Sequence, residues 1–230
     1  MTGVGAAKLA SRCELLRSLH VPGDPLLLPN AWDVATAKAV VKAGYPAVAT
    51  TSGGVAAALG YEDHEAAPAE EMLAAAARIA RGVEVPTTVD AESGYGLEPA
   101  DLVAALREAG AAGCNLEDTD HSSGTVRNAG AQAERLAGVR EAADGAGYPL
   151  VINARIDVFL ADFHGGAERP QAELVDEGLA RAGAYFEAGV DCVYPIALWQ
   201  ADALRAFVAG APGPVNALAI PRAPSPVELG

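Results

Sequence analysis

Thr88-Val89-Asp90-Ala91-Glu92-Ser93-Gly94-Tyr95-Gly96 ends an apolar run that begins at Val83. The side chains of a β-strand alternate between its two faces, so the pattern predicts that Asp90 and Glu92 point to the same face. Two neighbouring carboxylates repel each other unless a cation lies between them or one of them is protonated. A buried strand that ends in two acids and a glycine-rich turn is typical of the rim of an active site.

The segments around this stretch repeat a simple pattern of a helix followed by a short apolar strand. Ala-Gly pairs close three of the predicted helices, with the glycines at Gly44, Gly110 and Gly189. Glycine is common just after the last turn of a helix, so a strand is expected to begin beyond each pair. Other predicted strands start at a proline, where the missing N–H is not needed: Pro25, Pro86, Pro149 and Pro214.

Seven strands emerge, at about residues 25–30, 46–52, 86–91, 113–117, 149–155, 191–196 and 214–219. Helices are expected between them, at about residues 33–43, 68–82, 98–109, 130–146, 171–188 and 200–209. Aliphatic strands that alternate with helices predict an α/β fold with a parallel sheet, and their regular spacing favours a TIM-type barrel forming one domain over residues 1–230. A doubly wound sheet is the alternative, which the absence of a GxGxxG segment weakens.

A barrel of this type has eight strand–helix units, and the sequence accounts for seven strands. The eighth unit would begin near residues 227–230, at the end of the sequence. It is therefore expected to be missing or truncated, unless something else closes the barrel.

The composition narrows the class of protein. A net charge of −14 argues against nucleic acid or an anionic membrane as a partner. The three cysteines are far apart and indicate a reducing compartment, and Cys114 and Cys192 lie in apolar runs where core positions are expected. We find no secretion signal and no run of eighteen apolar residues, so a soluble, cytoplasmic protein is expected.

Polar residues follow nearly every predicted strand, and the C-terminal ends of barrel strands carry the catalytic groups. Asp33 opens a helix, so capping explains it better. The candidate metal ligands among these carboxylates are Asp90, Glu92, Glu117 and, from the loop after the second strand, Asp63. Oxygen ligands without histidine predict Mg²⁺ or Mn²⁺ rather than zinc.

Groups that can bind an anion accompany these acids. Ser52-Gly53-Gly54 offers backbone N–H groups for a carboxylate or an oxyanion. Arg155 offers a planar, charged fork for a second pair of oxygens, although an ion pair with the acids is the alternative. A cation beside anion-binding groups fits a small dianionic 2-oxo acid whose enolate the metal stabilises.

Five segments together resemble the isocitrate lyase/phosphoenolpyruvate mutase superfamily. They are Pro29-Asn-Ala-Trp-Asp33, Thr51-Ser-Gly-Gly-Val-Ala-Ala-Ala-Leu-Gly-Tyr-Glu-Asp63, Val89-Asp-Ala-Glu-Ser-Gly-Tyr-Gly96, Asn115-Leu-Glu-Asp118 and Asn153-Ala-Arg155. The resemblance implies a Mg²⁺-dependent barrel enzyme that makes or breaks C–C or C–P bonds in 2-oxo or 2-hydroxy carboxylates. It also implies a homo-oligomer, either a tetramer or a dimer.

The same resemblance implies roles for individual residues. Asp90 would hold the metal directly, whereas the other three acids, Glu92, Glu117 and Asp63, would ligate it mainly through water. Ser52, Gly53 and Gly54 would bind the substrate's carboxylate and 2-oxo oxygen, Arg155 its oxygens and Asn216 its distal carboxylate. Arg155 and Glu117 are thereby also expected among the catalytic residues.

The segment Thr119-Asp-His-Ser-Ser-Gly-Thr-Val-Arg-Asn128 departs from the superfamily pattern, because it lacks the cysteine and lysine of the lyase lid. Tyr194-Pro-Ile-Ala197 likewise replaces a glutamate of those lyases. We therefore reject cleavage of isocitrate and methylisocitrate, and C–P chemistry is disfavoured because the mutase lysine is also missing.

His121 in this lid is a candidate proton carrier, and Arg127 or the lid hydroxyls are candidates for contact with the substrate's distal group. A solvated loop with an incidental histidine is the alternative. The favoured function is a lyase resembling oxaloacetate decarboxylases or alkylmalate lyases. A phosphonopyruvate mutase or hydrolase and a catalytically inactive, metabolite-binding barrel remain as alternatives.

Overall fold

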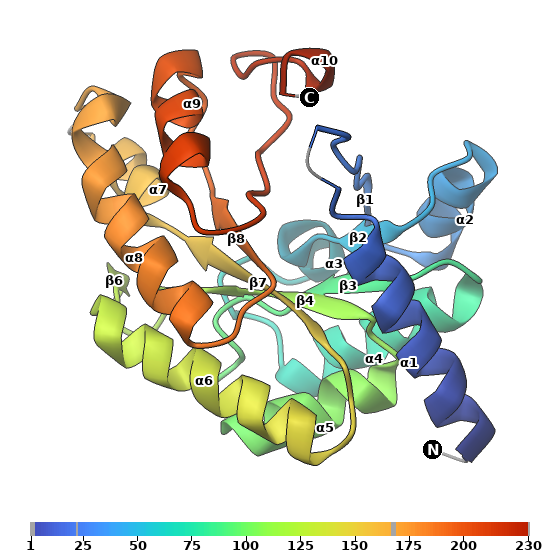
Figure 1. Ribbon diagram of the computed structural model, residues 1–230. Helices are drawn as coiled ribbons and strands as arrows, with labels where there is room; N and C mark the ends of the chain where they lie inside the picture. Colours follow the sequence, from blue (N-terminus) through green and yellow to red (C-terminus); the bar gives the residue numbers. More distant parts are fainter. Residues whose placement is uncertain (1–2, 22, 167–168, 230) are drawn as a thin grey trace. The chain divides into compact units, whose positions relative to one another are not determined.

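The computed structural model describes residues 3–21, 23–166 and 169–229 (Figure 1). Its internal contacts divide the chain into two compact units, and each is described by itself. The first unit comprises Met1–Leu19, Leu26–Leu116 and Gly138–Ile152. The second comprises His20–Pro25, Glu117–Ala137 and Asn153–Gly230.

The strands form one six-stranded sheet in the order β1-β2-β3-β4-β7-β8 and a separate two-stranded ribbon, β5-β6. The sheet strands are β1 (Asn30–Ala31), β2 (Val48–Thr50), β3 (Thr87–Asp90), β4 (Gly113–Glu117), β7 (Val151–Ile156) and β8 (Cys192–Pro195). The ribbon strands are β5 (Thr119–Asp120) and β6 (Thr125–Val126). All paired sheet strands whose register is known run parallel, which confirms the predicted α/β class.

The described part of the chain also contains ten α-helices and one 3₁₀-helix. They are α1 (Gly3–Ser18), α2 (Val34–Lys42), α3 (Ser52–Leu59), α4 (Ala69–Gly82), α5 (Pro99–Ala109), α6 (Ala129–Gly145), α7 (Val158–His164), η1 (Gln171–Leu174), α8 (Val175–Glu187), α9 (Ala201–Gly210) and α10 (Pro226–Leu229). Within the described residues, no helix is long and apolar enough to cross a membrane.

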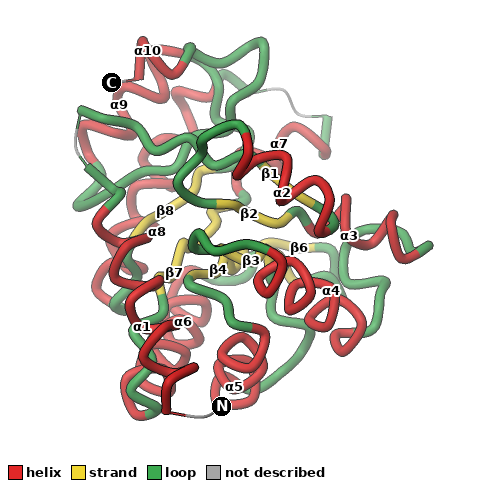
Figure 2. Tube along the Cα trace, turned by 90° about the vertical axis from the view of Figure 1, so that its right-hand side faces the viewer, coloured by secondary structure: helices red, strands yellow, loops and turns green. Residues whose placement is uncertain are grey.

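The first unit has a core of small and aliphatic side chains. Its strands β2, β3 and β4 run side by side (Figure 2), with Val48 opposite Thr87 and Val89 opposite Cys114. Helix α4 buries Met72 and Ile79 in this core, on the same face and two turns apart. Alanine-rich helices on aliphatic strands therefore build the support for the end of β3.

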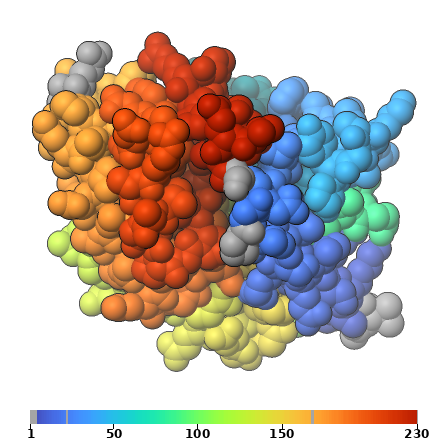
Figure 3. Space-filling model, turned by 45° about the horizontal axis from the view of Figure 1, so that its top comes forward, coloured from blue at the N-terminus to red at the C-terminus, as the bar shows by residue number. Residues whose placement is uncertain are grey.

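The core of the second unit contains aromatic side chains, among them Phe159 and Phe207. Strand β7 pairs with β8 from Asn153 opposite Cys192 onward. The rings of Phe159 and Phe207 meet edge to face, with their centroids 6.1 Å apart. Helices α8 and α9 lie next to each other, as the orange and red surfaces of Figure 3 show.

The predicted helices are observed, each within a few residues of the expected bounds, although the helix predicted at 171–188 starts as the 3₁₀-helix η1. The glycines predicted to end helices, Gly44, Gly110 and Gly189, have φ values of 95°, 80° and 90°. Both cysteines predicted for the core, Cys114 and Cys192, are buried. Asp33 caps α2, where its carboxylate accepts a 2.7 Å hydrogen bond from the Thr36 N–H.

Two predicted strands are largely absent. Only Asn30 of the segment 25–30 belongs to a strand, and the segment 214–219 provides a single bridge, between Val215 and Val193. Prolines at positions 25, 29, 212 and 214 have no N–H to donate to a neighbouring strand. Helices α1, α3, α7 and α10 and the β5-β6 ribbon were not predicted.

Candidate active site

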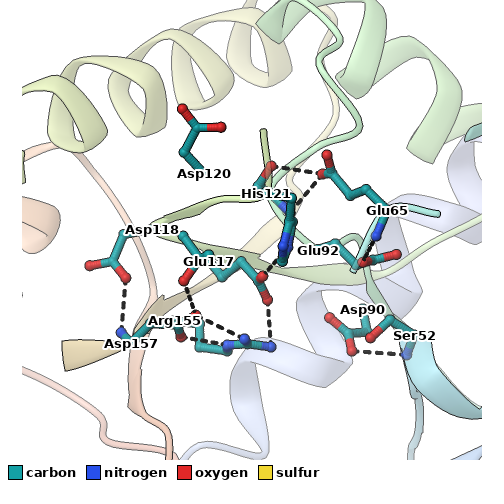
Figure 4. Close-up of polar contacts among 12 residues, drawn as sticks. Ser52, Glu65, Asp90, Glu92, Glu117, Asp118, Asp120, His121, Arg155 and Asp157 are labelled. Carbon is teal, nitrogen blue, oxygen red and sulfur yellow. Dashed lines mark hydrogen bonds and ion pairs between the residues drawn. The ribbon is translucent and has the colours of Figure 1, made fainter. Parts of the chain in front are cut away.

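Asp90, at the end of β3, is bound to the start of α3 (Figure 4). Its Oδ2 accepts a 3.0 Å hydrogen bond from the Ser52 N–H, and its own N–H donates to Thr50 Oγ1 over 2.9 Å. A carboxylate at the first residue of a helix is stabilised by the helix dipole and by the free N–H groups there. Asp90 Oδ1 is buried and has no hydrogen-bond partner among the described residues.

Asp63 approaches the same helix end from the loop after α3. A Cβ added to Gly53 would lie 2.8 Å from Asp63 Oδ2, so only glycine leaves room for this carboxylate. Asp63 Oδ1 is also buried and unpartnered within the described part of the chain. Two of the four predicted metal ligands, Asp63 and Asp90, therefore both reach the first turn of α3, and each keeps one oxygen available.

Glu92 does not belong to β3, so the prediction that it lies on the same strand face as Asp90 is wrong. The strand ends at Asp90, and Glu92 adopts a left-handed backbone with φ 48°. Its Oε2 accepts a 2.5 Å hydrogen bond from the Glu65 N–H. Glu92 is buried in the turn rather than placed one step along a strand.

Glu65 is a residue of this region that the sequence analysis missed. Its Oε1 accepts hydrogen bonds from the Ser93 N–H at 3.1 Å, the Ser93 hydroxyl at 2.7 Å and the Tyr95 N–H at 2.7 Å. Burial and the neighbouring Glu92 raise the pKa of Tyr95 far above its ordinary value, so its hydroxyl stays protonated beside the Glu92 carboxylate. The only sign of Glu65 in the sequence is its position two residues after Asp63, and an acid at such a position is common in exposed loops.

The Ser52-Gly53-Gly54 segment starts a helix instead of ending a strand. The Ser52 N–H, which was expected to bind substrate, donates to Asp90. Gly53 and Gly54 follow in the first turn of α3, ahead of the first helical hydrogen bond, from the Val55 N–H to Thr51 O. Their binding of a substrate oxygen stays a prediction.

Glu117, at the end of β4 in the second unit, joins two other predicted site residues. Arg155 Nη1 lies 2.5 Å from Glu117 Oε2, and His121 Nε2 lies 2.5 Å from Glu117 Oε1. The exposed fraction of these side chains is only 2% for Glu117, 12% for Arg155 and 9% for His121. The His121 side chain is therefore largely shielded from solvent and lies against a carboxylate, so it is not a solvated histidine. Its role as a proton carrier stays a prediction.

Arg155 is held on its other side by Asp157. Its Nε and Nη2 donate to the two carboxylate oxygens of Asp157 over 2.6 and 2.9 Å. The Thr119 hydroxyl donates to the same carboxylate over 2.6 Å. The ion pair considered as the alternative role of Arg155 is thus present, and its contact with a substrate stays a prediction.

Asp118 organises a buried network behind these residues. Its Oδ1 accepts from the Asp157 N–H at 2.8 Å, and its Oδ2 accepts from Tyr185 at 2.7 Å and from Arg181 Nη1 at 3.0 Å. Burial, followed by the charge of Asp157, raises the pKa of Asp118 to about 6. Arg181 and Tyr185 lie one turn apart on α8, and nothing in their sequence context distinguished them.

The predicted lid is the β5-β6 ribbon. Asp120 Oδ1 accepts from both the N–H and the hydroxyl of Ser122, at 2.9 and 2.7 Å, so these groups are used within the turn. At the end of the ribbon, the Arg127 N–H donates to Asp118 O over 2.7 Å, and Arg127 O accepts from Arg181 over 2.9 Å. The backbone of Arg127 is therefore anchored, and its contact with a substrate is not tested.

Asn216 lies in the second unit, where its N–H donates to Val193 O over 2.8 Å. The predicted contact of its side chain with a distal carboxylate remains a prediction. Over the described residues, no three His, Cys, Asp or Glu side chains form a group ready to hold a metal ion. Mg²⁺ commonly keeps several waters and takes only one or two carboxylates, so the pair of open Oδ1 atoms on Asp63 and Asp90 fits this cation.

Comparison with known proteins gives consistent matches over most of the chain. The family model of phosphoenolpyruvate phosphomutase matches residues 16–230. The 2-methylisocitrate lyase of Escherichia coli is 30% identical over 219 residues, which cover 87% of this chain and 70% of that protein. A solved Burkholderia cenocepacia J2315 protein with a provisional phosphonomutase name is 42% identical, with a TM-score of 0.88 and coverage of 95% of this chain and 88% of that one.

More distant solved structures share the fold. They include oxaloacetate acetylhydrolase with its product oxalate, 2,3-dimethylmalate lyase, and phosphonopyruvate hydrolase with oxalate and Mg²⁺. They are 22–23% identical to this chain, with TM-scores from 0.75 to 0.80. Together with the family match, they confirm the expected resemblance and the barrel-type α/β fold. The chain belongs to the phosphoenolpyruvate phosphomutase family, within the PEP mutase/isocitrate lyase superfamily of lyases and mutases.

Proposed function

We propose that the chain is a Mg²⁺-dependent lyase that makes or breaks a C–C bond in a small 2-oxo or 2-hydroxy di- or tricarboxylate. The observation that carries this proposal is the pair of buried, unpartnered carboxylate oxygens, Asp63 Oδ1 and Asp90 Oδ1, at the start of α3. A buried anionic oxygen without a partner is costly, and a cation removes that cost. Mn²⁺ has the same preference for oxygen ligands and is an alternative metal.

Asp90 would hold the metal directly, and Asp63 and Glu92 would bind it mainly through water. The role of Glu117 as a further ligand stays a prediction from the sequence. A bound Mg²⁺ supplies a positive charge for the carboxylate and 2-oxo oxygens of a substrate. The distant relative solved with oxalate and Mg²⁺ supports this choice of cation and ligand, since oxalate resembles a planar enolpyruvate.

The second unit would supply the proton transfer. Glu117 orients His121 through the 2.5 Å contact to Nε2, and His121 gives a proton to the substrate carbon or takes one from it. Arg155 is held rigidly by two carboxylates, which suits a guanidinium that binds substrate oxygens in one orientation. Neither cysteine nor lysine is present in the ribbon, so substrates of the oxaloacetate or alkylmalate type are favoured over isocitrate.

An assay of the purified protein with oxaloacetate, alkylmalates and phosphonopyruvate tests the proposal. We expect C–C cleavage with Mg²⁺ and its loss in EDTA, and we expect Asp90→Asn to abolish it. No turnover of any of these substrates, together with no change of melting temperature on adding Mg²⁺, would support the alternative of a catalytically inactive, metabolite-binding barrel.

C–P chemistry on phosphonopyruvate is the second candidate. It is favoured by the provisional phosphonomutase name of the 42% identical Burkholderia relative. Turnover of phosphonopyruvate alone in the same assay would select it. A cytoplasmic homo-oligomer, as a tetramer or a dimer, completes the proposal, and sedimentation analysis of the purified protein tests the oligomeric state.

A further inference from the structure

Two loops of the first unit bind each other reciprocally through two glutamates (Figure 4). Glu65, in the loop that carries Asp63, donates its N–H to Glu92 Oε2 over 2.5 Å. In return, the Glu65 carboxylate accepts two hydrogen bonds from Ser93 and one from Tyr95, in the loop that follows Asp90. Both loops also carry a predicted metal ligand, Asp63 in one and Glu92 in the other.

Backbone strain is concentrated in the same two loops. Among the described residues, five that are not glycine have positive φ, and four of them lie here: His64 at 68°, Glu65 at 58°, Glu92 at 48° and Tyr95 at 55°. Such conformations persist only when the surrounding structure enforces them, and they collect at functional sites. The hydrogen bonds of Glu65 join these two strained turns to each other.

We propose that Glu65 is a positioning residue for the cation site, acting through Asp63 rather than as a ligand. This inference rests on the proposed function, because it assumes that Asp63 and Asp90 bind Mg²⁺. Glu65 Oε1 already accepts three hydrogen bonds, so the carboxylate serves the neighbouring loop. His64 alone separates Glu65 from Asp63, so the hydrogen bonds of Glu65 would fix the backbone that carries Asp63 and thereby the direction of Asp63 Oδ1.

The consequence is a dependence of metal affinity on a residue that does not touch the metal. Without the Glu65 carboxylate, the turn that carries His64 loses three hydrogen bonds to the neighbouring loop, and Asp63 is expected to shift from its place against Gly53. The start of α3 then keeps Asp90 but loses the second oxygen. Removal of a group that holds a ligand in place lowers metal affinity by about tenfold to a hundredfold.

Isothermal titration of Mg²⁺ into the purified full chain tests this inference with three variants. Glu65→Ala removes the three hydrogen bonds that the Glu65 carboxylate accepts. Glu65→Gln keeps an oxygen that accepts hydrogen bonds but loses the charge. Glu62→Ala is the matched control, because Glu62 is an exposed acid of the same loop that takes no part in the network. Circular dichroism first establishes that each variant is folded at the temperature used.

We expect Glu65→Ala to bind Mg²⁺ at least about tenfold more weakly, and Glu65→Gln and Glu62→Ala to stay close to the wild type. Equal losses in Glu65→Gln and Glu65→Ala would mean that charge, not positioning, is responsible, and would overturn the inference. Unchanged affinity in Glu65→Ala would overturn it as well, while leaving the metal site itself intact.

A wild-type chain that binds no Mg²⁺ would instead overturn the metal site of the proposed function. Where Glu65→Ala does not fold, Ser93→Ala takes its place, because it removes only the hydroxyl donor to Glu65. A measurable loss of Mg²⁺ affinity in Ser93→Ala supports the inference, and wild-type affinity in that variant contradicts it.

Discussion

Tyr185 donates a 2.7 Å hydrogen bond to Asp118 Oδ2, and both side chains are fully buried. Arg181, one turn earlier on α8, donates to the same oxygen over 3.0 Å. The other oxygen of Asp118 accepts from the Asp157 N–H, and Asp157 in turn holds Arg155. Helix α8 is thus connected to Arg155 through two carboxylates that have no contact with solvent.

Tyr185→Phe should lower the free energy of unfolding by about 1–3 kcal/mol, because it leaves a buried carboxylate with one donor fewer. Urea denaturation followed by circular dichroism measures the change. Tyr61→Phe is the control, since the Tyr61 hydroxyl bonds to Glu71 at an exposed site. Its loss should stay within about 0.5 kcal/mol. Equal losses in the two variants would contradict the importance of the buried bond.

Arg181→Met should cost more, about 3 kcal/mol, because it removes the cationic partner of a buried carboxylate. Replacing both members, as Asp118→Leu with Arg181→Met, should recover only part of that loss. No unpaired charge then remains in the interior, but the Asp157 N–H and the Tyr185 hydroxyl lose their acceptor. A double-mutant cycle on the free energy of unfolding measures the coupling between the two. A coupling close to zero would show that the 3.0 Å contact contributes nothing.

Much of the fold could be predicted because the chain marks its own element ends. Ala-Gly pairs precede β2, β4 and β8, and the glycine of each pair has a left-handed backbone that ends the helix a few residues before the strand begins. The strands predicted at residues 25–30 and 214–219 are largely absent, because prolines in and beside these segments have no N–H to donate. Each segment also pairs with one neighbouring strand in the described structure, and the apolar character of the sequence does not reveal this. Helix α3 was missed because Gly53 and Gly54 disfavour a helix, whereas the Asp90 carboxylate stabilises its first turn from a distant segment.

The candidate site was predictable only where residue type suffices. Asp90, Glu117 and Arg155 were predicted because each is an acid or an arginine at the end of a predicted strand, a criterion that needs no knowledge of their contacts. Glu65 and Arg181 could not be found in this way. The hydrogen bonds of Glu65 reach residues 27 to 30 positions away, and those from Arg181 to Asp118 and Arg127 span 63 and 54 positions. Strand periodicity also misplaced Glu92, since the left-handed turn after Asp90 depends on the hydrogen bond from Glu65.

Asp33 should make the stability of α2 depend on pH. Hydrogen bonds from the N–H and the hydroxyl of Thr36 lower the pKa of Asp33 in the folded chain below its ordinary value of 3.8. A lowered pKa means that this stabilisation is complete above the ordinary pKa and is lost as the pH falls through the folded value. Asp33→Asn keeps the cap but not the charge, so its melting temperature should lie below that of the wild type above about pH 5. The difference should shrink as the pH falls below 3.8, and a constant difference over this range would contradict the assignment.

His121→Asn should lower turnover by about a hundredfold or more if His121 carries the proton, because a positioned acid or base contributes about that factor. The structure strengthens this expectation, since His121 Nε2 lies 2.5 Å from a carboxylate that also holds Arg155. Steady-state kinetics on the substrate identified by the Mg²⁺ assay measures the change, and the effect should fall on kcat rather than KM. His164→Asn is the control, because His164 is exposed at the end of α7, outside the candidate site. A change within about twofold in His121→Asn would remove His121 from the reaction, and the proton would then have to come from another group of the β5-β6 ribbon or from water.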